Sequence, residues 1–396
     1  MSHSLLITLE YPPQKGGVAN YYAGIAQHWP YGKLEVLHVK LGHMWPRWLS
    51  IFFQINSKLK TQNSKLELVK VGQVLPLGYV ALLLKWCTGL PYLVYTHGMD
   101  ILVPQNDWHK KLLLKYILKQ AKLVVANSEF TKHEVVKLGI AASKVVVVYP
   151  CVLFEGLASA SAELGFRDYT KPASRLLSHS HKPAHSGLPQ TSPRAHMPAP
   201  LAPVIILTVS RLVTRKGIDT VLAALPEVIK KVPNIQYVVI GDGPDKARLT
   251  RLAAKITPPA PSYDKRGLGG VNPVLFLGAI SDEQRTEWYN KASVFVLVPR
   301  PLPGDVEGFG MVYIEANSFG LPVVGSRTGG GTEAVLDGVT GLVIAPNNPH
   351  ETSQALITLL TQKSLADTLG RQGRERSKNE FIWKTQLQKL SPFFSS

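Results

Sequence analysis

The sequence of 396 residues predicts an α/β protein with two Rossmann-like domains, each a doubly wound parallel sheet, that face one another across a cleft. Three observations predict this class. Short runs of Val, Leu and Ile alternate with longer helical patterns, which is typical of parallel sheets covered on both faces. This alternation occurs twice, on either side of a stretch rich in Pro and Ser. The length also suits two domains of about 100–200 residues each.

The first alternating series predicts an N-terminal domain at residues 1–154. A strand is expected at each short apolar run. These runs are Leu5–Leu9, Leu34–Val39, Leu66–Val71, Tyr92–Tyr95, Leu123–Ala126 and Val145–Tyr149. Residues 155–202 are rich in Pro, Ser and His and lack periodicity, so we expect a flexible insertion or linker there.

The second series predicts a C-terminal domain at residues 203–375. Its expected strands are Val204–Val209, Tyr237–Ile240, Val274–Leu277, Val294–Val298, Val323–Gly325 and Leu342–Ile344. A second loop insertion is predicted over residues 258–273. Ligands of open α/β sheets bind beyond the carboxyl ends of the strands, so candidate site residues are sought after these runs.

Two carboxylates, Glu307 and Glu315, stand eight positions apart after the strand Val294–Val298. Glu307 lies in a glycine-rich loop, and Glu315 lies where the predicted helix Met311–Phe319 has begun. A loop that opens a helix binds anions, because free N–H groups and the helix dipole point at the ligand. The acids would repel a bare anion but could accept hydrogen bonds from hydroxyl groups attached to it. A ligand that is both a phosphate and a polyol is a nucleotide sugar.

Basic residues follow the strand Val204–Val209. Arg211 and Lys216 flank a short loop that leads into a helix. Arginine can hold phosphate oxygens in a bidentate way, and lysine adds a mobile charge, so together they could stabilise a diphosphate leaving group. Two surface bases on a loop are the alternative. Their position in the same domain as Glu307 favours phosphate binding.

Three further motifs follow predicted strands. Gly16 and Gly17 open a helix near Ala19, without the spacing of a dinucleotide or Walker loop. His97 precedes a glycine and could bind a sugar hydroxyl or assist proton movement, although a structural histidine is an alternative. The run from Gly329 to Glu333 offers bare N–H groups or a hinge. No Asp-x-Asp pair is suited to a metal diphosphate, so we expect no metal.

Composition narrows the possible partners. The net charge of +17 implies anionic partners. Basic residues from Lys110 to Lys122 alternate with apolar ones on a predicted amphipathic helix, which fits either a solvated face or contact with an anionic membrane. No basic stripe has aromatic residues interleaved in it, so we do not expect nucleic acid as a partner.

Three observations bear on the cellular location. The N-terminus lacks the basic leader of a signal peptide, and no window reaches the ~18 apolar residues that a membrane span needs. Only two cysteines, Cys87 and Cys151, are present. We therefore expect a cytoplasmic location, with peripheral contact at the inner face of the membrane.

Taken together, these motifs resemble the GT-B glycosyltransferases of the large retaining family 4, from Leu5 to about Phe381. Residues 307–315 match the family's E-x7-E pattern, and residues 210–217 match its phosphate loop. His97-Gly98, Asn127-Ser128 and the glycine run before Glu333 also fit. Residues 210–229 and 305–324 are similar to the phosphatidylinositol-mannoside-type mannosyltransferases, which use GDP-mannose. The family's Gly-Gly-x-Pro-Glu is Gly-Gly-Gly-Thr-Glu here.

The resemblance implies a role for each candidate residue. Arg211 and Lys216, with Gly16 and Gly17, would bind the donor diphosphate, and Glu315 would bind the ribose. The transferred sugar would be held by the segment Glu307, Gly308, Phe309 and Gly310. His97 would lie near the reacting carbon, so His97 and Glu307 are the expected catalytic residues. The C-terminal segment, about 376–396, would cross back to the N-terminal domain through Phe381-Ile382-Trp383.

The expected activity is therefore transfer of a hexose, mannose above all, from a nucleotide diphosphate sugar to a hydroxyl of a lipid-linked or glycan acceptor. No cofactor is expected besides the co-substrate, GDP-mannose. Two alternatives stay open. A sugar-nucleotide epimerase of the same fold would need no acceptor, and a noncatalytic sugar-nucleotide binder would not turn over its ligand.

Overall fold

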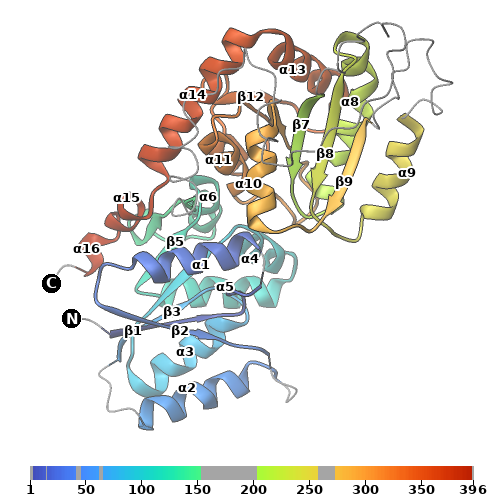
Figure 1. Ribbon diagram of the computed structural model, residues 1–396. Coiled ribbons are helices and arrows are strands. Elements are labelled where there is room, and N and C mark those ends of the chain that lie inside the picture. The colour runs from blue at the N-terminus through green and yellow to red at the C-terminus, as the bar shows by residue number, and fades with distance from the viewer. Residues whose placement is uncertain are drawn as a thin grey trace, which may run out of the picture.

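The computed structural model describes residues 3–14, 16–41, 46–61, 66–152, 203–256 and 273–394. Within them the chain forms two lobes, each built on a six-stranded sheet whose paired strands run parallel. Figure 1 shows the N-terminal lobe from blue to blue-green and the C-terminal lobe from green to red. The fold class predicted from the sequence is confirmed. The expected insertion at residues 155–202 and almost all of that at 258–273 lie outside the described residues.

The sheet of the N-terminal lobe has the order β2-β1-β3-β4-β5-β6. Its strands are β1 (His3–Thr8), β2 (Lys33–His38), β3 (Leu66–Val71), β4 (Tyr92–Thr96), β5 (Leu123–Ala126) and β6 (Val145–Val147). Successive side chains of a strand point to opposite faces of the sheet. Leu5 and Ile7 therefore join one apolar cluster, whereas Leu6 joins another. Both faces of this sheet are buried, as the continuous apolar runs predict.

Helices cover both faces of that sheet. They are α1 (Gly17–His28), α2 (Leu49–Thr61), α3 (Leu77–Thr88), α4 (Met99–Leu102), α5 (Trp108–Gln120) and α6 (Glu129–Lys137), with short 3-10 turns η1 (Val103–Asn106) and η2 (Ala142–Lys144). Helices α2, α3 and α5 pack with Leu5 and Ile7, and α1 packs on the opposite face through Tyr21, Tyr22 and Ile25.

The sheet of the C-terminal lobe has the order β12-β11-β10-β7-β8-β9. Its strands are β7 (Val204–Val209), β8 (Ile235–Ile240), β9 (Val274–Gly278), β10 (Val294–Val296), β11 (Val323–Ser326) and β12 (Gly341–Ile344). Each strand predicted from the sequence is present, with ends that differ by two residues at most. The strand expected to reach Val298 ends at Val296, because pairing with β11 stops there although Leu297 and Val298 stay buried.

The C-terminal lobe is covered in the same way. Its helices are α8 (Ile218–Lys231), α9 (Lys246–Ile256), α10 (Asp282–Lys291), α11 (Met311–Ser318), α12 (Gly331–Ala334), α13 (Pro349–Thr361) and α14 (Lys363–Glu380), with the 3-10 turn η4 (Thr214–Lys216). Helices α8 and α13 bury apolar residues in one cluster of this lobe, and α10 and α11 contribute Tyr289 and Ile314 to another.

The last helices of the chain return to the N-terminal lobe. After α14, helix α15 (Trp383–Gln388) packs against α1, and α16 (Ser391–Phe394) follows it (Figure 1). Phe381 belongs to an apolar cluster of the C-terminal lobe, whereas Trp383 belongs to one of the N-terminal lobe. Gln386 Oε1 also accepts a hydrogen bond of 3.0 Å from the backbone N–H of Tyr149. The crossing segment thus contributes to the cores of both lobes.

Candidate functional site between the lobes

The basic loop after β7 forms one wall of the candidate site. It runs through η4 and ends at Gly217, where α8 begins. Gly217 is left-handed at φ 68°, and a Cβ there would lie 2.0 Å from the Val298 carbonyl oxygen, so only glycine fits. The turn places Arg215 and Lys216 against the loop that follows β10.

Glu307 is the acceptor for both of these bases. Its Oε2 lies 2.7 Å from Arg215 Nη1 and 2.6 Å from Lys216 Nζ. Arg215 also pairs with Asp305 at 2.6 Å. The side chains of Glu307, Arg215 and Lys216 are each about nine-tenths buried. No hydrogen bond or ion pair joins Glu307 Oε1 to any residue that the structure describes.

The paired charges decide the protonation of this cluster. Burial raises the pKa of Glu307, but Lys216 and Arg215 outweigh it and hold the pKa at about 2. For Lys216, burial lowers the pKa, and the Glu307 charge opposes that shift. The carboxylate is therefore ionised at neutral pH. The ammonium of Lys216 has three donors and gives one to Glu307, which leaves two for a ligand.

Arg215 is a site residue that sequence reasoning missed. The sequence predicts Arg211 and Lys216 as the phosphate-binding bases, but the structure exposes Arg211, and its guanidinium makes no ion pair within the described residues. Arg215 is only 5% exposed and holds the Glu307 carboxylate. The sole signal in the sequence was its place next to Lys216. Which of two bases in one loop turns inward depends on the neighbouring loop.

The loop from Glu307 to Gly310 leads into α11. Gly310 is left-handed at φ 87°, and a Cβ there would lie 2.6 Å from the Tyr313 ring. The Phe309 side chain is buried between Tyr149 and Phe381, with ring centroids at 5.2 and 5.6 Å. The phenyl ring thus anchors the loop in the core.

Helices from both lobes begin at the same place. A Cβ at Gly17, the first residue of α1, would lie 3.4 Å from Met311 Sδ, at the first residue of α11. Gly16 precedes Gly17 and lies near Glu10. The first turns of α1 and α11 therefore approach each other between the lobes. Both have unsatisfied N–H groups and a positive dipole end, which favour an anion there.

Glu315 lies one turn into α11. Its Oε2 accepts a hydrogen bond of 3.1 Å from the Tyr289 hydroxyl of α10, and Tyr289 stacks on Phe319 with ring centroids 5.0 Å apart. Arg285 is close enough for the Glu315 charge to act on it. The side chain of Glu315 is half-buried, so its carboxylate is held in place while part of it stays accessible.

His97 follows β4 and meets the Glu307 loop. A Cβ at Gly308 would lie 2.4 Å from the His97 carbonyl oxygen, so the two loops touch across the lobes. The ring Nε2 lies 2.6 Å from the Tyr22 hydroxyl, and the backbone N–H donates to Asp100 at 2.8 Å. Burial lowers the pKa of His97 to about 4. The imidazole is neutral at pH 7, which suits hydrogen bonding rather than charge stabilisation.

The glycine run before Glu333 packs against the Glu307 loop. Gly330 donates its N–H to the Glu307 carbonyl oxygen at 3.0 Å, and a Cβ at Gly330 would lie 2.2 Å from the Gly308 carbonyl oxygen. From the sequence, this run is expected either to offer bare N–H groups to a ligand or to act as a hinge. Gly330 instead uses its N–H inside the protein, and its missing side chain permits close backbone packing.

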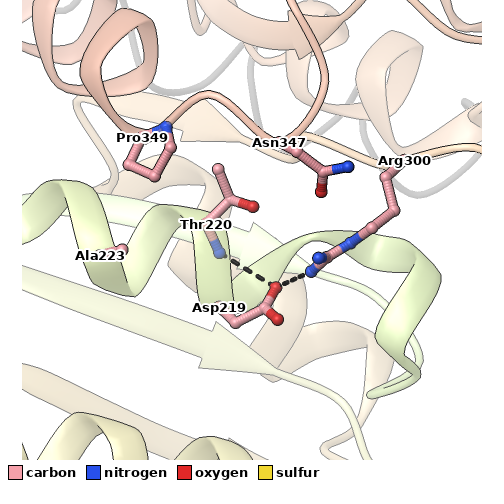
Figure 2. Close-up of a pocket in the computed structure, with 6 residues that line it drawn as sticks. All are labelled: Asp219, Thr220, Ala223, Arg300, Asn347 and Pro349. Carbon is pink, nitrogen blue, oxygen red and sulfur yellow. Dashed lines mark hydrogen bonds and ion pairs between the residues drawn. The ribbon is translucent and has the colours of Figure 1, made fainter.

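A shallow pocket of about 330 Å³ lies behind the basic loop. Figure 2 shows its lining, in which Asp219 bridges the backbone N–H of Thr220 and the guanidinium of Arg300. The other lining residues are Ala223, Asn347 and Pro349. None of the site residues predicted from the sequence lines this pocket. The backbone N–H of Arg300 donates to the backbone carbonyl oxygen of Arg215 at 2.8 Å, so these residues support the basic loop from behind.

Two family models match the chain. The one described as Glycosyltransferase Family 4 matches residues 15–153, and the one described as Glycosyl transferases group 1 matches residues 192–376. Among curated proteins, a GDP-mannose-dependent alpha-(1-6)-phosphatidylinositol monomannoside mannosyltransferase of Mycolicibacterium smegmatis is 34% identical over 193 residues, 48% of this chain and 47% of that protein. A GDP-mannose-dependent monoacylated alpha-(1-6)-phosphatidylinositol monomannoside mannosyltransferase of Corynebacterium glutamicum is 31% identical over 194 residues, which is 48% of this chain and 47% of that protein. The matched region spans about half the length of these relatives.

Solved structures share the fold at lower identity. Sucrose-phosphate synthase from Thermosynechococcus elongatus aligns with a TM-score of 0.70 at 20% identity and covers 100% of this chain and 98% of that one. Anabaena HepE, solved with UDP and glucose, aligns with a TM-score of 0.68 at 16% identity over 99% of both chains. The two matched regions follow one another along the chain and coincide with the two sheets described above, so the chain is built from two glycosyltransferase domains, one of family 4 and one of group 1, in the GT-B fold.

Proposed function

We propose that the chain transfers mannose from GDP-mannose to a hydroxyl of a lipid-linked or glycan acceptor, with retention of the anomeric configuration and without a metal. The observation that carries this proposal is the Glu307 cluster. Two buried bases hold Oε2, and Oε1 is left to accept a hydrogen bond from a sugar hydroxyl. The curated relatives described as GDP-mannose-dependent support the choice of donor.

The diphosphate would lie where helix tips and bases meet. Arg211 and the two remaining donors of Lys216 would bind its oxygens, and the first turns of α1 and α11 would add backbone N–H groups. Charge grows on the β-phosphate as the sugar leaves, so fixed positive groups stabilise the transition state more than the ground state. Positive side chains would thus take the place of a metal.

The sugar would be oriented from both lobes. Glu307 and the backbone of Gly308 to Gly310 would hold its hydroxyls, and neutral His97 would contact it near the reacting carbon. Glu315, fixed by Tyr289, would bind the ribose hydroxyls. In a retaining transfer the acceptor arrives on the face from which the diphosphate departs, so a β-phosphate oxygen is the nearest base for its proton. Glu307 is already engaged with two cations and would not act as a covalent nucleophile.

A lipid-linked acceptor fits one surface of the N-terminal lobe. On α5, Trp108, Leu112 and Tyr116 are 65%, 60% and 42% exposed, and Trp86 of α3, 64% exposed, lies 6.5 Å from Tyr116 between ring centroids. Exposed lysines flank them at positions 110, 111, 119 and 122. Apolar rings amid lysines match an anionic membrane surface. No described helix is long and apolar enough to cross a bilayer. A cytoplasmic protein bound peripherally to the membrane remains our proposal.

The direct test offers isotope-labelled GDP-mannose, UDP-hexoses and ADP-hexoses to the purified chain. We expect GDP-mannose to raise the melting temperature, to be hydrolysed slowly, and to give a retained glycoside once a lipid-linked acceptor is added. Lys216→Gln should lower kcat by about 10²–10³-fold, because one charge at the leaving group is lost. Lys246→Gln, which removes a surface lysine paired with Asp242, is the matched control. Absence of both binding and hydrolysis for every donor would refute the proposal.

A further inference from the structure

One carboxylate of the C-terminal lobe binds the backbone of the N-terminal lobe. Glu333 of α12 accepts the N–H of Glu129 through Oε2 at 2.6 Å and the N–H of Phe130 through Oε1 at 2.7 Å. These are the first two residues of α6, where free N–H groups and the helix dipole favour a negative charge. The contact joins residues more than 200 positions apart.

Tyr149 adds a third hydrogen bond to the same carboxylate. Its hydroxyl donates to Glu333 Oε2 at 3.0 Å. Burial, and after it the Glu333 charge, raises the pKa of Tyr149, so the phenol stays protonated as a donor. The Tyr149 ring also packs on Phe309 of the Glu307 loop. Helix α12 is held from behind by Arg376 of α14, which donates to the Glu333 carbonyl oxygen at 2.8 Å.

Both ends of this contact lead directly to the candidate site. On one side, α12 follows Gly330, which packs on the Glu307 loop. On the other side, α6 follows Asn127, and a Cβ at Gly308 would lie 3.2 Å from Asn127 Nδ2. The contact therefore spans the two lobes beside the place where the His97 and Glu307 loops meet.

We propose that Glu333 is a positioning residue whose carboxylate clamps the N-terminus of α6 and thereby sets the closed arrangement of the lobes in which His97 faces the Glu307 loop. Water can replace each of these hydrogen bonds when the lobes separate, so the clamp can open for product release. The catalytic part of this inference rests on the proposed function. The clamp itself does not.

The test compares Glu333→Gln with the wild type in the full chain. Glutamine keeps the shape but loses the charge and one acceptor oxygen. Amide hydrogen exchange at Glu129 and Phe130 should accelerate about tenfold, which corresponds to a loss of about 1.4 kcal/mol at 25 °C. The Kd for GDP-mannose should stay within about threefold, because most donor contacts lie in the C-terminal lobe, while kcat should fall about 10–100-fold through misplacement.

Two further variants bracket the result. Tyr149→Phe removes only one of the three hydrogen bonds and should shift exchange and kcat in the same direction by less. Glu351→Gln is the matched control, because that carboxylate also accepts a backbone N–H, from Ala345 at 2.7 Å, but inside one lobe. It should alter neither α6 exchange nor kcat.

Each outcome decides the inference. Unchanged exchange at α6 in Glu333→Gln would show that the clamp does not form in solution. Faster exchange with unchanged kcat would make the contact merely structural and overturn the positioning role. If the wild type turns over no donor, the proposed function fails, yet the exchange measurements still support or overturn the clamp.

Discussion

At the scale of single residues, Glu307 keeps its negative charge although it is buried inside the protein. A carboxylate that is only 8% exposed would ordinarily be neutralised by burial. Arg215 and Lys216 reverse that tendency, and each base is in turn compensated by the acid. Removing one partner of such a buried group leaves uncompensated charge and costs about 3–5 kcal/mol. The stability of this cluster must therefore depend on pH.

Glu307→Gln tests that dependence. The pKa of Glu307 is about 2, below its ordinary value of 4.5, so its ionic stabilisation is complete above pH 4.5 and is lost as the pH falls towards 2. Urea denaturation should show the variant about 3 kcal/mol less stable above pH 4.5, with the difference shrinking at lower pH. Glu287→Gln, in an exposed pair with Lys291, should stay within about 0.5 kcal/mol of wild type. A difference for Glu307→Gln that is constant with pH would contradict this account.

At the scale of elements, the return of α15 to α1 joins the end of the chain to the N-terminal lobe. Gly24 lies in the middle of α1, where glycine costs about 1 kcal/mol of helix stability relative to alanine. A Cβ at Gly24 would lie 2.2 Å from the ring of Trp383, which is only 3% exposed. Only glycine leaves room for Trp383 of α15 at this position, so α1 has a lower helical propensity here in exchange for close packing.

Gly24→Ala distinguishes helix propensity from steric conflict with Trp383, because the two predict opposite changes in the free energy of unfolding. Helix propensity alone predicts stabilisation by about 1 kcal/mol. The steric conflict with Trp383 predicts a net loss of about 1–3 kcal/mol, measured by urea denaturation. Trp383→Leu should destabilise the chain by itself but relieve the conflict, so the double variant should be more stable than the sum of the single changes predicts. A stabilised Gly24→Ala variant would mean that α15 does not rest on α1.

At the scale of the whole molecule, charge and exposed aromatic side chains occur together on one side of the N-terminal lobe. The net charge is +17, and α5 presents Trp108 and Leu112 among lysines. Such a surface attracts anionic lipids by about 1 kcal/mol per lysine near the membrane, and the attraction is screened over about 10 Å at 0.1 M salt.

We therefore expect the chain to co-sediment with vesicles containing anionic lipid at low salt and to be released as salt rises. Replacing both Lys111 and Lys119 by Gln should weaken binding roughly 25-fold, because each lysine contributes roughly fivefold. Trp108→Ser should weaken the vesicle binding that persists at high salt, because that binding depends on apolar contact and not on charge. The control replaces Lys246 and Lys291 on the C-terminal lobe by Gln. Equal binding to neutral and anionic vesicles would exclude this role for the surface.

Much of the architecture follows from local sequence alone. Continuous apolar runs can be buried only between two helical layers, so Leu66–Val71 and Val204–Val209 predict their strands without any knowledge of the rest. The spacing of Glu307 and Glu315 predicts an acid in a loop and an acid in a helix, and both are found there. These properties depend on residues near one another in the chain, which is why the sequence determines them.

The pairing of polar groups, by contrast, depends on how the chain folds in three dimensions. Arg215 rather than Arg211 holds Glu307, Glu333 reaches α6, and Trp383 rests on Gly24 because segments far apart in sequence approach one another. Hydrogen bonds and ion pairs act over about 3 Å and depend on direction, so no periodicity in the chain encodes their partners. Apolar burial, by contrast, is non-directional and is visible in the sequence as a pattern.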